Sequence, residues 1–377
     1  MTALPIETEQ PQRQSRVKTL DGMRGLAALG VMWFHFANQL DPAGFATSAF
    51  RFILVTGPRL ELFFILSGFL VTGILYDSKT RPRYYRNFYT RRMLRILPLY
   101  YGALTILFVM PYLVSAPGAA QFRAPLEDQL WYWFYLQNFN PLPPQFVGLA
   151  WHLWSLAIEQ QFYLVWPILI LKTSRETALK VCGGLIMLSI TYRFFGDYDG
   201  SLRPYWPTPA RLDGIAVGSA LALLMRGPGG LVPLRRRLNP IFLIAAAYLA
   251  VYAVFEKMDI DKTPMFPLYF TATAVFFGSL TVYAIFAGEG RGAQLMRSRV
   301  LAFFGKYGYG LYVFHVPLVS IAALAGFNPG SLSWIGSEFL DSVVYVAAMT
   351  ALSTAVALLS WHAWEKQFIK LKRVKVT

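Results

Sequence analysis

Long apolar segments separated by short charged loops run along the whole chain. Ten of them are long enough to cross a bilayer as helices, since about 20 mainly apolar residues span its hydrocarbon core. We place these spans at residues 25–41, 60–76, 96–115, 150–171, 179–195, 210–226, 239–255, 267–287, 301–324 and 340–361. The short alternating strands of a membrane barrel are not seen. The pattern predicts an all-α fold, a polytopic transmembrane helical bundle of about ten spans.

One aromatic segment, residues 129–140, is too short to span the membrane. Its tryptophans and tyrosines favour a short interfacial or re-entrant segment. The domain organisation follows from these placements. We expect a polar N-terminal tail over 1–19, a single transmembrane domain over 20–368 and a basic tail over 369–377.

The distribution of charge predicts which way the bundle faces. Charged residues make up only 15% of the chain, well below the roughly 25% of soluble domains. The net charge of +15 lies mainly in alternate loops, which argues for membrane topology rather than for a nucleic-acid partner. By the positive-inside rule these basic loops and both termini are cytoplasmic. The basic set is Lys79, Arg81, Arg83, Arg86, Arg91, Arg92, Arg95, Lys172, Arg175, Arg235, Arg236, Arg237, Arg291, Arg297, Arg299, Lys366, Lys370, Lys372, Arg373 and Lys375. The opposite loops hold only Arg51, Arg59, Arg123, Arg203, Lys257 and Lys262.

Two ionisable residues share one face of the first span. Arg24 and His35 are eleven residues apart, almost three helical turns, or about 16 Å along the axis. This places the arginine near the inner membrane surface and the imidazole near the middle of the bilayer. A group that deep is costly and is a functional-site candidate. The alternative is a histidine that hydrogen-bonds a neighbouring helix.

A second polar face begins at the outer end of the fourth span. His152, Ser155 and Glu159 are spaced three and four residues apart, so they lie on one side of a helix. Together with the face of the first span they can line a path through the bilayer. The alternative is hydrogen bonding between helices that holds the bundle together.

Three arginines, Arg91, Arg92 and Arg95, lie at the cytoplasmic entry of the third span. Guanidinium forks suit phosphate oxygens, so the cluster is a candidate site for an anionic cytoplasmic cofactor. The alternative is a cluster that only sets topology or contacts anionic lipid.

Further polar residues interrupt the remaining apolar segments. A passive anchor has no reason to bury acids, arginines and histidines in so many helices. The four histidines show no metal-binding spacing, and no phosphate-binding glycine motif is present. We therefore expect no metal and no prosthetic group. The further candidate site residues are Glu61, Ser67, Arg211, Asp213, Tyr309 and His315.

Several ordered motifs together resemble the acyltransferase-3 family of integral membrane acyltransferases, from about Leu20 to Phe368. Two positions depart from the family pattern: Gln160 stands where an acid is usual, and Glu61 where aspartate is frequent. The motifs that carry the resemblance are Leu20-Asp21-Gly22-Met23-Arg24-Gly25 followed by His35, Leu62 to Phe69, Arg92 to Pro98, Trp154 to Tyr163, Arg211-Leu212-Asp213 and Tyr309 to His315. Asp21 joins the candidate site residues on this ground.

The resemblance implies transfer of an acetyl or other acyl group from cytoplasmic acyl-CoA to a hydroxyl group. The acceptor would be a carbohydrate or lipid-linked glycan, such as exopolysaccharide or lipopolysaccharide, at a bacterial inner membrane. The chain is expected to act without the extracytoplasmic hydrolase-like domain that many members carry. Arg91, Arg92 and Arg95 would bind acetyl-CoA, and the thioester would reach towards His35.

Roles within this site follow from the same resemblance. His35 would take the acceptor's proton or carry the acyl group, while Arg24 or Arg211 stabilises the oxyanion or holds an acid. Glu159 would orient a histidine or the acceptor. One alternative function is a proton-coupled transporter or exporter of a glycan or glycolipid, which would use the same buried groups as a relay. Another is a membrane scaffold or sensor without catalysis.

Overall fold

The computed structural model describes residues 9–41, 44–56, 60–115, 118–140, 148–196, 205–261, 263–288 and 290–371, and within these ranges all regular structure is helical. Arg59, Arg203, Lys262 and the tail from Lys372 onwards lie outside the described residues. A helix lies at each of the ten expected spans. These helices are α1 (Glu9–Ala37), α3 (Leu60–Asp77), α4 (Tyr84–Leu113), α6 (Trp154–Lys172), α7 (Arg175–Phe194), α8 (Leu212–Met225), α10 (Leu238–Lys257), α11 (Phe266–Phe286), α13 (Arg299–Leu324) and α14 (Glu338–Ser360).

Six of these helices (α3, α4, α10, α11, α13 and α14) are long and apolar enough to cross a membrane. The other four helices are too short or too polar to meet this criterion. α8 has only 14 residues, while α1, α6 and α7 carry polar or charged positions. The polytopic helical bundle of an integral membrane protein is therefore confirmed, and the count of ten spans stays a prediction.

The structure adds elements that the apolar pattern did not predict. α2 (Phe45–Thr56) is an apolar helix of 12 residues, too short to register as a span. α1 begins at Glu9 rather than near residue 25, because glutamine, arginine and glutamate in its polar half are good helix formers. The remaining short elements are α5 (Leu126–Trp133), α9 (Val232–Arg236), α12 (Arg291–Met296), the π-helical turn Trp361–Glu365, α15 (Lys366–Lys370) and 3-10 turns at Ala119–Phe122, Gln137–Phe139, Gly148–Leu153, Thr208–Arg211, Thr263–Met265 and Pro329–Ile335.

The aromatic segment at 129–140 folds back onto the bundle instead of lying apart from it. α5 is followed by the turn Gln137–Phe139, whose Gln137 and Asn138 are buried. The Gln137 side-chain amide donates to the Leu153 carbonyl at 2.8 Å, and that of Asn138 donates to Thr208 at 2.8 Å. The segment is short, as expected, and it supports the start of α6.

Two helix pairs are packed backbone to backbone through glycine. A Cβ added at Gly25 of α1 would lie 1.9 Å from the Leu301 carbonyl oxygen of α13, and one at Gly305 would lie 2.2 Å from that of Asp21. A Cβ added at Gly218 of α8 would likewise lie 2.0 Å from the Ile65 carbonyl oxygen of α3. Small residues allow such close approach between membrane helices.

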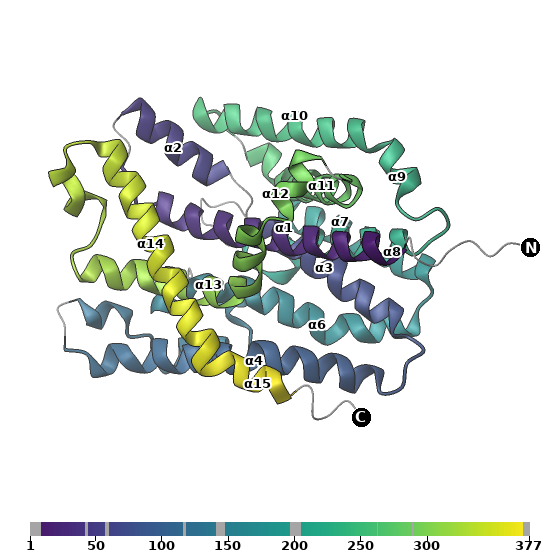
Figure 1. Ribbon diagram of the computed structural model, residues 1–377, viewed down its shortest axis with the longest axis horizontal. Coiled ribbons are helices and arrows are strands. Elements are labelled where there is room, and N and C mark those ends of the chain that lie inside the picture. Colours follow the sequence, from purple (N-terminus) through teal and green to yellow (C-terminus); the bar gives the residue numbers. More distant parts are fainter. Residues whose placement is uncertain are drawn as a thin grey trace, which may run out of the picture.

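Figure 1 shows how these pairs are arranged. α1 crosses the middle of the view, with α3 and α13 close to it, while α4 and α10 form opposite margins. α6 lies beside α4, where the Tyr84 hydroxyl of α4 donates to the Pro167 carbonyl of α6 at 3.1 Å. The space between the α1/α13 pair and the α4/α6 pair holds the candidate site.

Candidate active site

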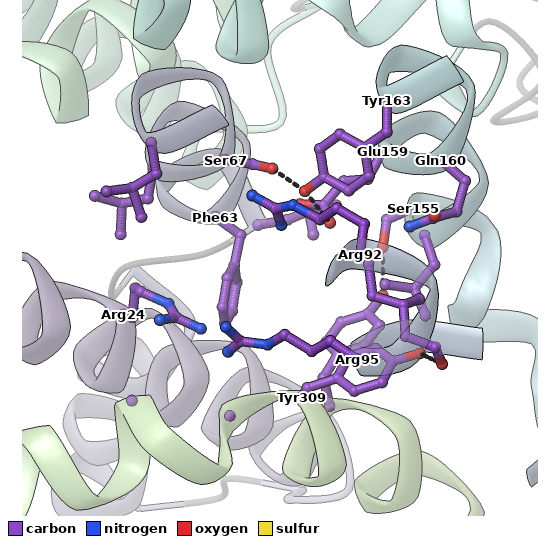
Figure 2. Close-up of a pocket in the computed structure, with 18 of the residues that line it drawn as sticks. Arg24, Phe63, Ser67, Arg92, Arg95, Ser155, Glu159, Gln160, Tyr163 and Tyr309 are labelled. Carbon is purple, nitrogen blue, oxygen red and sulfur yellow. Dashed lines mark hydrogen bonds between the residues drawn. The ribbon is translucent and has the colours of Figure 1, made fainter. Parts of the chain in front are cut away.

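A cavity of about 320 Å³ lies between α1, α3, α4, α6 and α13 (Figure 2). Its charged lining consists of three arginines and two acids, and aromatic and aliphatic side chains complete the wall. This size is at the lower end of small-molecule sites, which span about 300–1,000 Å³. The polar and charged lining residues are Asp21, Arg24, Ser67, Arg92, Arg95, Ser155, Glu159, Gln160, Tyr163, Tyr309 and Tyr312.

The three arginines enter the cavity from two helices, and their guanidinium groups face the same open space in Figure 2. Arg24 of α1 lies 3.7 Å from the Asp21 carboxylate, one turn earlier. Arg92 of α4 lies over the Tyr163 ring, 4.7 Å from its centroid. Within the part of the chain that the structure describes, neither Arg92 nor Arg95 donates a side-chain hydrogen bond. Their donors are therefore available to an anionic ligand.

Arg91 does not belong to this group. It is exposed and does not line the cavity. Successive residues of an α-helix are rotated by about 100°, so Arg91 and Arg92 lie on either side of Arg95, and the cavity lies on the Arg92 side. The structure thus brings together two of the three arginines that the sequence grouped as a cofactor site.

Glu159 of α6 belongs to a chain of three hydrogen-bonding groups across the cavity. The Tyr163 hydroxyl donates to the Glu159 carboxylate at 3.3 Å, and the Ser67 hydroxyl of α3 is hydrogen-bonded to the Tyr163 hydroxyl. Figure 2 shows these side chains on the same side of the cavity as Arg92. Glu159 is therefore held in place beside the arginines rather than paired with one of them.

Ser155 and Tyr312 form a hydrogen-bonded part of the cavity wall. The Tyr312 hydroxyl donates to the His152 carbonyl at 2.6 Å, so the Ser155 hydroxyl is the donor in its 2.5 Å bond to Tyr312. Tyr309, one turn before Tyr312, donates to the Ile96 carbonyl at 3.0 Å. The serine and tyrosine separate the cavity from the histidines behind them.

Three histidines from three different elements meet behind this layer. The ring centroid of His315 lies 4.9 Å from that of His35 and 5.3 Å from that of His152. His152 and His315 are fully buried, whereas His35 is partly exposed and lies edge-on to Trp151. None of the three lines the cavity. The expected faces on the first and fourth spans therefore meet at this cluster, and α13 contributes the third member.

Other predicted site residues form ion pairs away from the cavity. Arg211 at the start of α8 is paired with Glu61 of α3, and its guanidinium lies 3.9 Å from the centroid of the Phe270 ring. Asp213 binds Arg193 of α7 at 2.9 Å. These acids and cations neutralise one another in a dry environment. Arg211 was expected either to stabilise the oxyanion or to hold an acid, and its pairing with Glu61 agrees with the second role. It does not line the cavity.

Sequence reasoning gave no role to several residues in and around the site. Tyr163 follows Glu159 by four residues, a spacing that puts it on the same helix face. Tyr312 precedes His315 by three residues on α13. Arg193 was visible as a lone basic residue inside an apolar segment. In each case the residue type and its spacing are visible in the sequence, but its partner on another helix cannot be identified there.

Comparisons with known proteins give the family. The acyltransferase-3 family model, described as an acyltransferase domain, matches residues 17–362. A Bacillus subtilis protein named "Putative peptidoglycan O-acetyltransferase" is 26% identical over 94% of this chain and 55% of its own length. A Listeria monocytogenes protein named "Peptidoglycan O-acetyltransferase" is 24% identical over 81% of this chain and 50% of its own length.

The chain thus spans about half the length of these curated relatives. No solved structure matches the chain significantly. The family match covers all the residues that line the cavity and all three histidines behind it. The resemblance seen in the ordered motifs is confirmed, and the chain belongs to the acyltransferase-3 family of membrane acyltransferases.

Proposed function

We propose that this protein is an O-acetyltransferase that takes an acetyl group from acetyl-CoA and transfers it to a hydroxyl of a cell-envelope carbohydrate. The observation that carries the proposal is the cavity in which Arg92 and Arg95 present unused donors beside Arg24. Guanidinium groups recognise phosphate oxygens, and coenzyme A is rich in them. The names of the relatives support an O-linked product and a glycan of the peptidoglycan class.

We infer the direction of transfer from the predicted topology. The positive-inside rule places the loop before α4, and with it the arginine end of the cavity, at the cytoplasmic face of the inner membrane. Both termini are cytoplasmic in the same arrangement. His35 lies about three turns further along α1, on the far side of the Ser155–Tyr312 layer. The donor therefore enters from the cytoplasm, and the acceptor approaches the histidines from the opposite side.

The chemical step needs a base for the acceptor hydroxyl and stabilisation of the oxyanion. His35 takes the hydroxyl proton as the hydroxyl oxygen attacks the thioester carbonyl, the carbon–sulfur bond breaks, and CoA leaves as thiolate. Arg24 lines the cavity and is placed to stabilise negative charge on the donor, which Arg211 is not. Glu159, fixed by Tyr163, sets the position of the groups around the thioester.

The test uses the purified full chain in sealed vesicles. Acetyl-CoA is enclosed on the side of the basic loops, and a membrane-impermeant glycan, such as a soluble peptidoglycan strand, is supplied on the other side. We expect release of CoA thiol that depends on the glycan, together with acetylated glycan outside. Acetylation of a glycan on the CoA side alone would overturn the transmembrane direction. Glycan movement without thiol release would favour a transporter.

A further inference from the structure

We infer that His315 is a positioning residue that, together with the Val31 carbonyl, holds His35 in its Nδ1–H tautomer and orients its ring for proton transfer. The inference rests on the proposed function for its kinetic consequences, but its structural content stands separately. It comes from the hydrogen bonds that the two imidazoles make inside the histidine cluster.

The first step is the tautomer of His315. Its Nδ1 lies 2.8 Å from the Tyr312 carbonyl oxygen and 3.1 Å from that of Leu311. A carbonyl oxygen can only accept, so Nδ1 carries the proton. In the neutral ring Nε2 is then bare and can only accept a hydrogen bond. The α13 backbone therefore orients the His315 ring so that the lone pair of Nε2 can accept a hydrogen bond from a neighbouring group.

The group that faces it is His35. His35 Nδ1 lies 3.1 Å from His315 Nε2 and 2.8 Å from the Val31 carbonyl oxygen. Both of these partners are acceptors, so His35 Nδ1 must carry a proton and share it between them. His35 Nε2 is consequently bare, and it makes no hydrogen bond within the described part of the chain. His35 is also the one histidine of the three whose ring is partly exposed, so its Nε2 is the accessible nitrogen of the cluster.

This arrangement gives His35 what a general base needs. An unpartnered, unprotonated Nε2 can take a proton from an acceptor hydroxyl, while Nδ1–H stays bound to His315. The imidazolium formed in the step is then stabilised by a neutral acceptor 3.1 Å away. His315 itself gains and loses no proton. It acts as the third group that orients the base in a nucleophile–base–orienter arrangement.

Two substitutions separate this role from a packing role. His315→Gln places an amide oxygen near the position of Nε2 and keeps an acceptor for His35. His315→Asn keeps a donor for the α13 carbonyls and removes that acceptor. We expect the Asn variant to lose about 10–100-fold in kcat, the usual effect of removing such a supporting partner, with KM for acetyl-CoA unchanged. The Gln variant should recover much of the loss.

A matched control is available at His362, which is exposed and bonds the Leu358 carbonyl of its own helix at 2.8 Å. His362→Gln should leave kcat and KM unchanged. Equal kcat for His315→Asn and His315→Gln would overturn the inference, because a packing role does not distinguish the two amides.

A measurement independent of activity tests the tautomers directly. The chain has four histidines, so ¹⁵N-histidine labelling gives few signals, and single variants assign them. We expect His35 and His315 to be protonated at Nδ1 in the wild type, and His35 to take up the Nε2–H form in part in His315→Asn. A wild-type His35 protonated at Nε2 would contradict the inference. Correct tautomers without acetyl transfer would instead contradict the proposed function.

Discussion

Two regions of this molecule hold inward-facing arginines, and the surroundings of these arginines differ. In the α3/α7/α8/α11 region each buried arginine has a carboxylate: Arg211 is paired with Glu61, and Arg193 with Asp213. Arg193 also donates to the Pro267 carbonyl at 2.9 Å and to Thr271 at 2.8 Å. In the cavity, by contrast, the guanidinium groups of Arg92 and Arg95 donate to no group in the described residues.

The contrast separates structural from functional charges. A buried cation is tolerated when a carboxylate neutralises its charge, and both arginines of the first region meet this condition. Arg193 also uses its donors, whereas Nε and Nη1 of Arg211 have no hydrogen-bond partner among the described residues. In the cavity Arg24 is paired with Asp21, but Arg92 and Arg95 have neither an ion pair nor a used donor among the described residues, so water or a bound anion must satisfy them. From sequence alone all of these residues looked alike, because each is an ionisable residue in an apolar segment.

The largest effect is expected from breaking a structural pair. Arg193→Met leaves Asp213 buried without its cation, which costs about 3–5 kcal/mol. That is a large share of a typical unfolding free energy of about 5–15 kcal/mol. We expect little monodisperse protein after purification in detergent, measured by size-exclusion chromatography. Lys180→Met on the exposed face of the same helix is the control and should behave as wild type. Normal yield and thermal stability of Arg193→Met would remove the distinction between the two regions.

Glu159→Gln should act on catalysis instead. The substitution keeps the hydrogen bond with Tyr163 possible and removes the negative charge beside Arg92. We expect kcat to fall by about 10²–10⁴-fold, the range for lost acid–base or positioning help, while acetyl-CoA binding and folded yield stay normal. Rates come from acceptor-dependent thiol release, and binding comes from calorimetry. Loss of folded protein would place Glu159 with the structural charges.

Arg95→Ala should weaken the donor complex. One charge-assisted hydrogen bond contributes about 1.5–3 kcal/mol, which corresponds to a Kd for acetyl-CoA raised by about 10–100-fold. Arg91→Ala is the matched control, because Arg91 is exposed on the same helix and does not line the cavity. Its Kd should be unchanged, and the difference should shrink for an acetyl thioester that lacks the nucleotide phosphates. An equal rise in Kd for Arg95→Ala and Arg91→Ala would mean that acetyl-CoA binding depends only on the general surface charge.

Gln160→Glu should give the smallest effect. Gln160 lines the cavity, and its buried amide nitrogen has no partner among the described residues. A carboxylate there reduces the positive potential of the cavity, so we expect Kd for acetyl-CoA to rise by about 3–10-fold, which equals about 0.7–1.4 kcal/mol. Gln160→Leu removes the amide without adding charge and should change Kd less. Tighter binding in the Glu variant would show that this position does not face the donor's phosphates.

Helix positions were predictable because a spanning helix needs a long apolar segment, and α3, α11 and α13 have one. Helix faces were predictable as well, since Arg92 with Arg95, and Ser155 with Glu159, follow from spacing alone. Contacts between helices were not predictable. Nothing in the local pattern says that His315 meets His35, or that Arg193 rather than another cation neutralises Asp213. α2 was missed because a helix of 12 residues lies below the length that marks a span.

The glycine contact between α1 and α13 has a mechanical consequence. Backbone meets backbone at Gly25 and Gly305, with no side-chain layer that could yield. Arg24, His35 and His315 therefore lie on a rigid pair of packed helices. α4, in contrast, is attached to α6 through the ends of tyrosine side chains and contains Pro98 and Pro111. A ligand larger than about 320 Å³ is therefore expected to displace α4 rather than the α1/α13 pair, because α4 is the wall that lacks such a backbone-to-backbone contact.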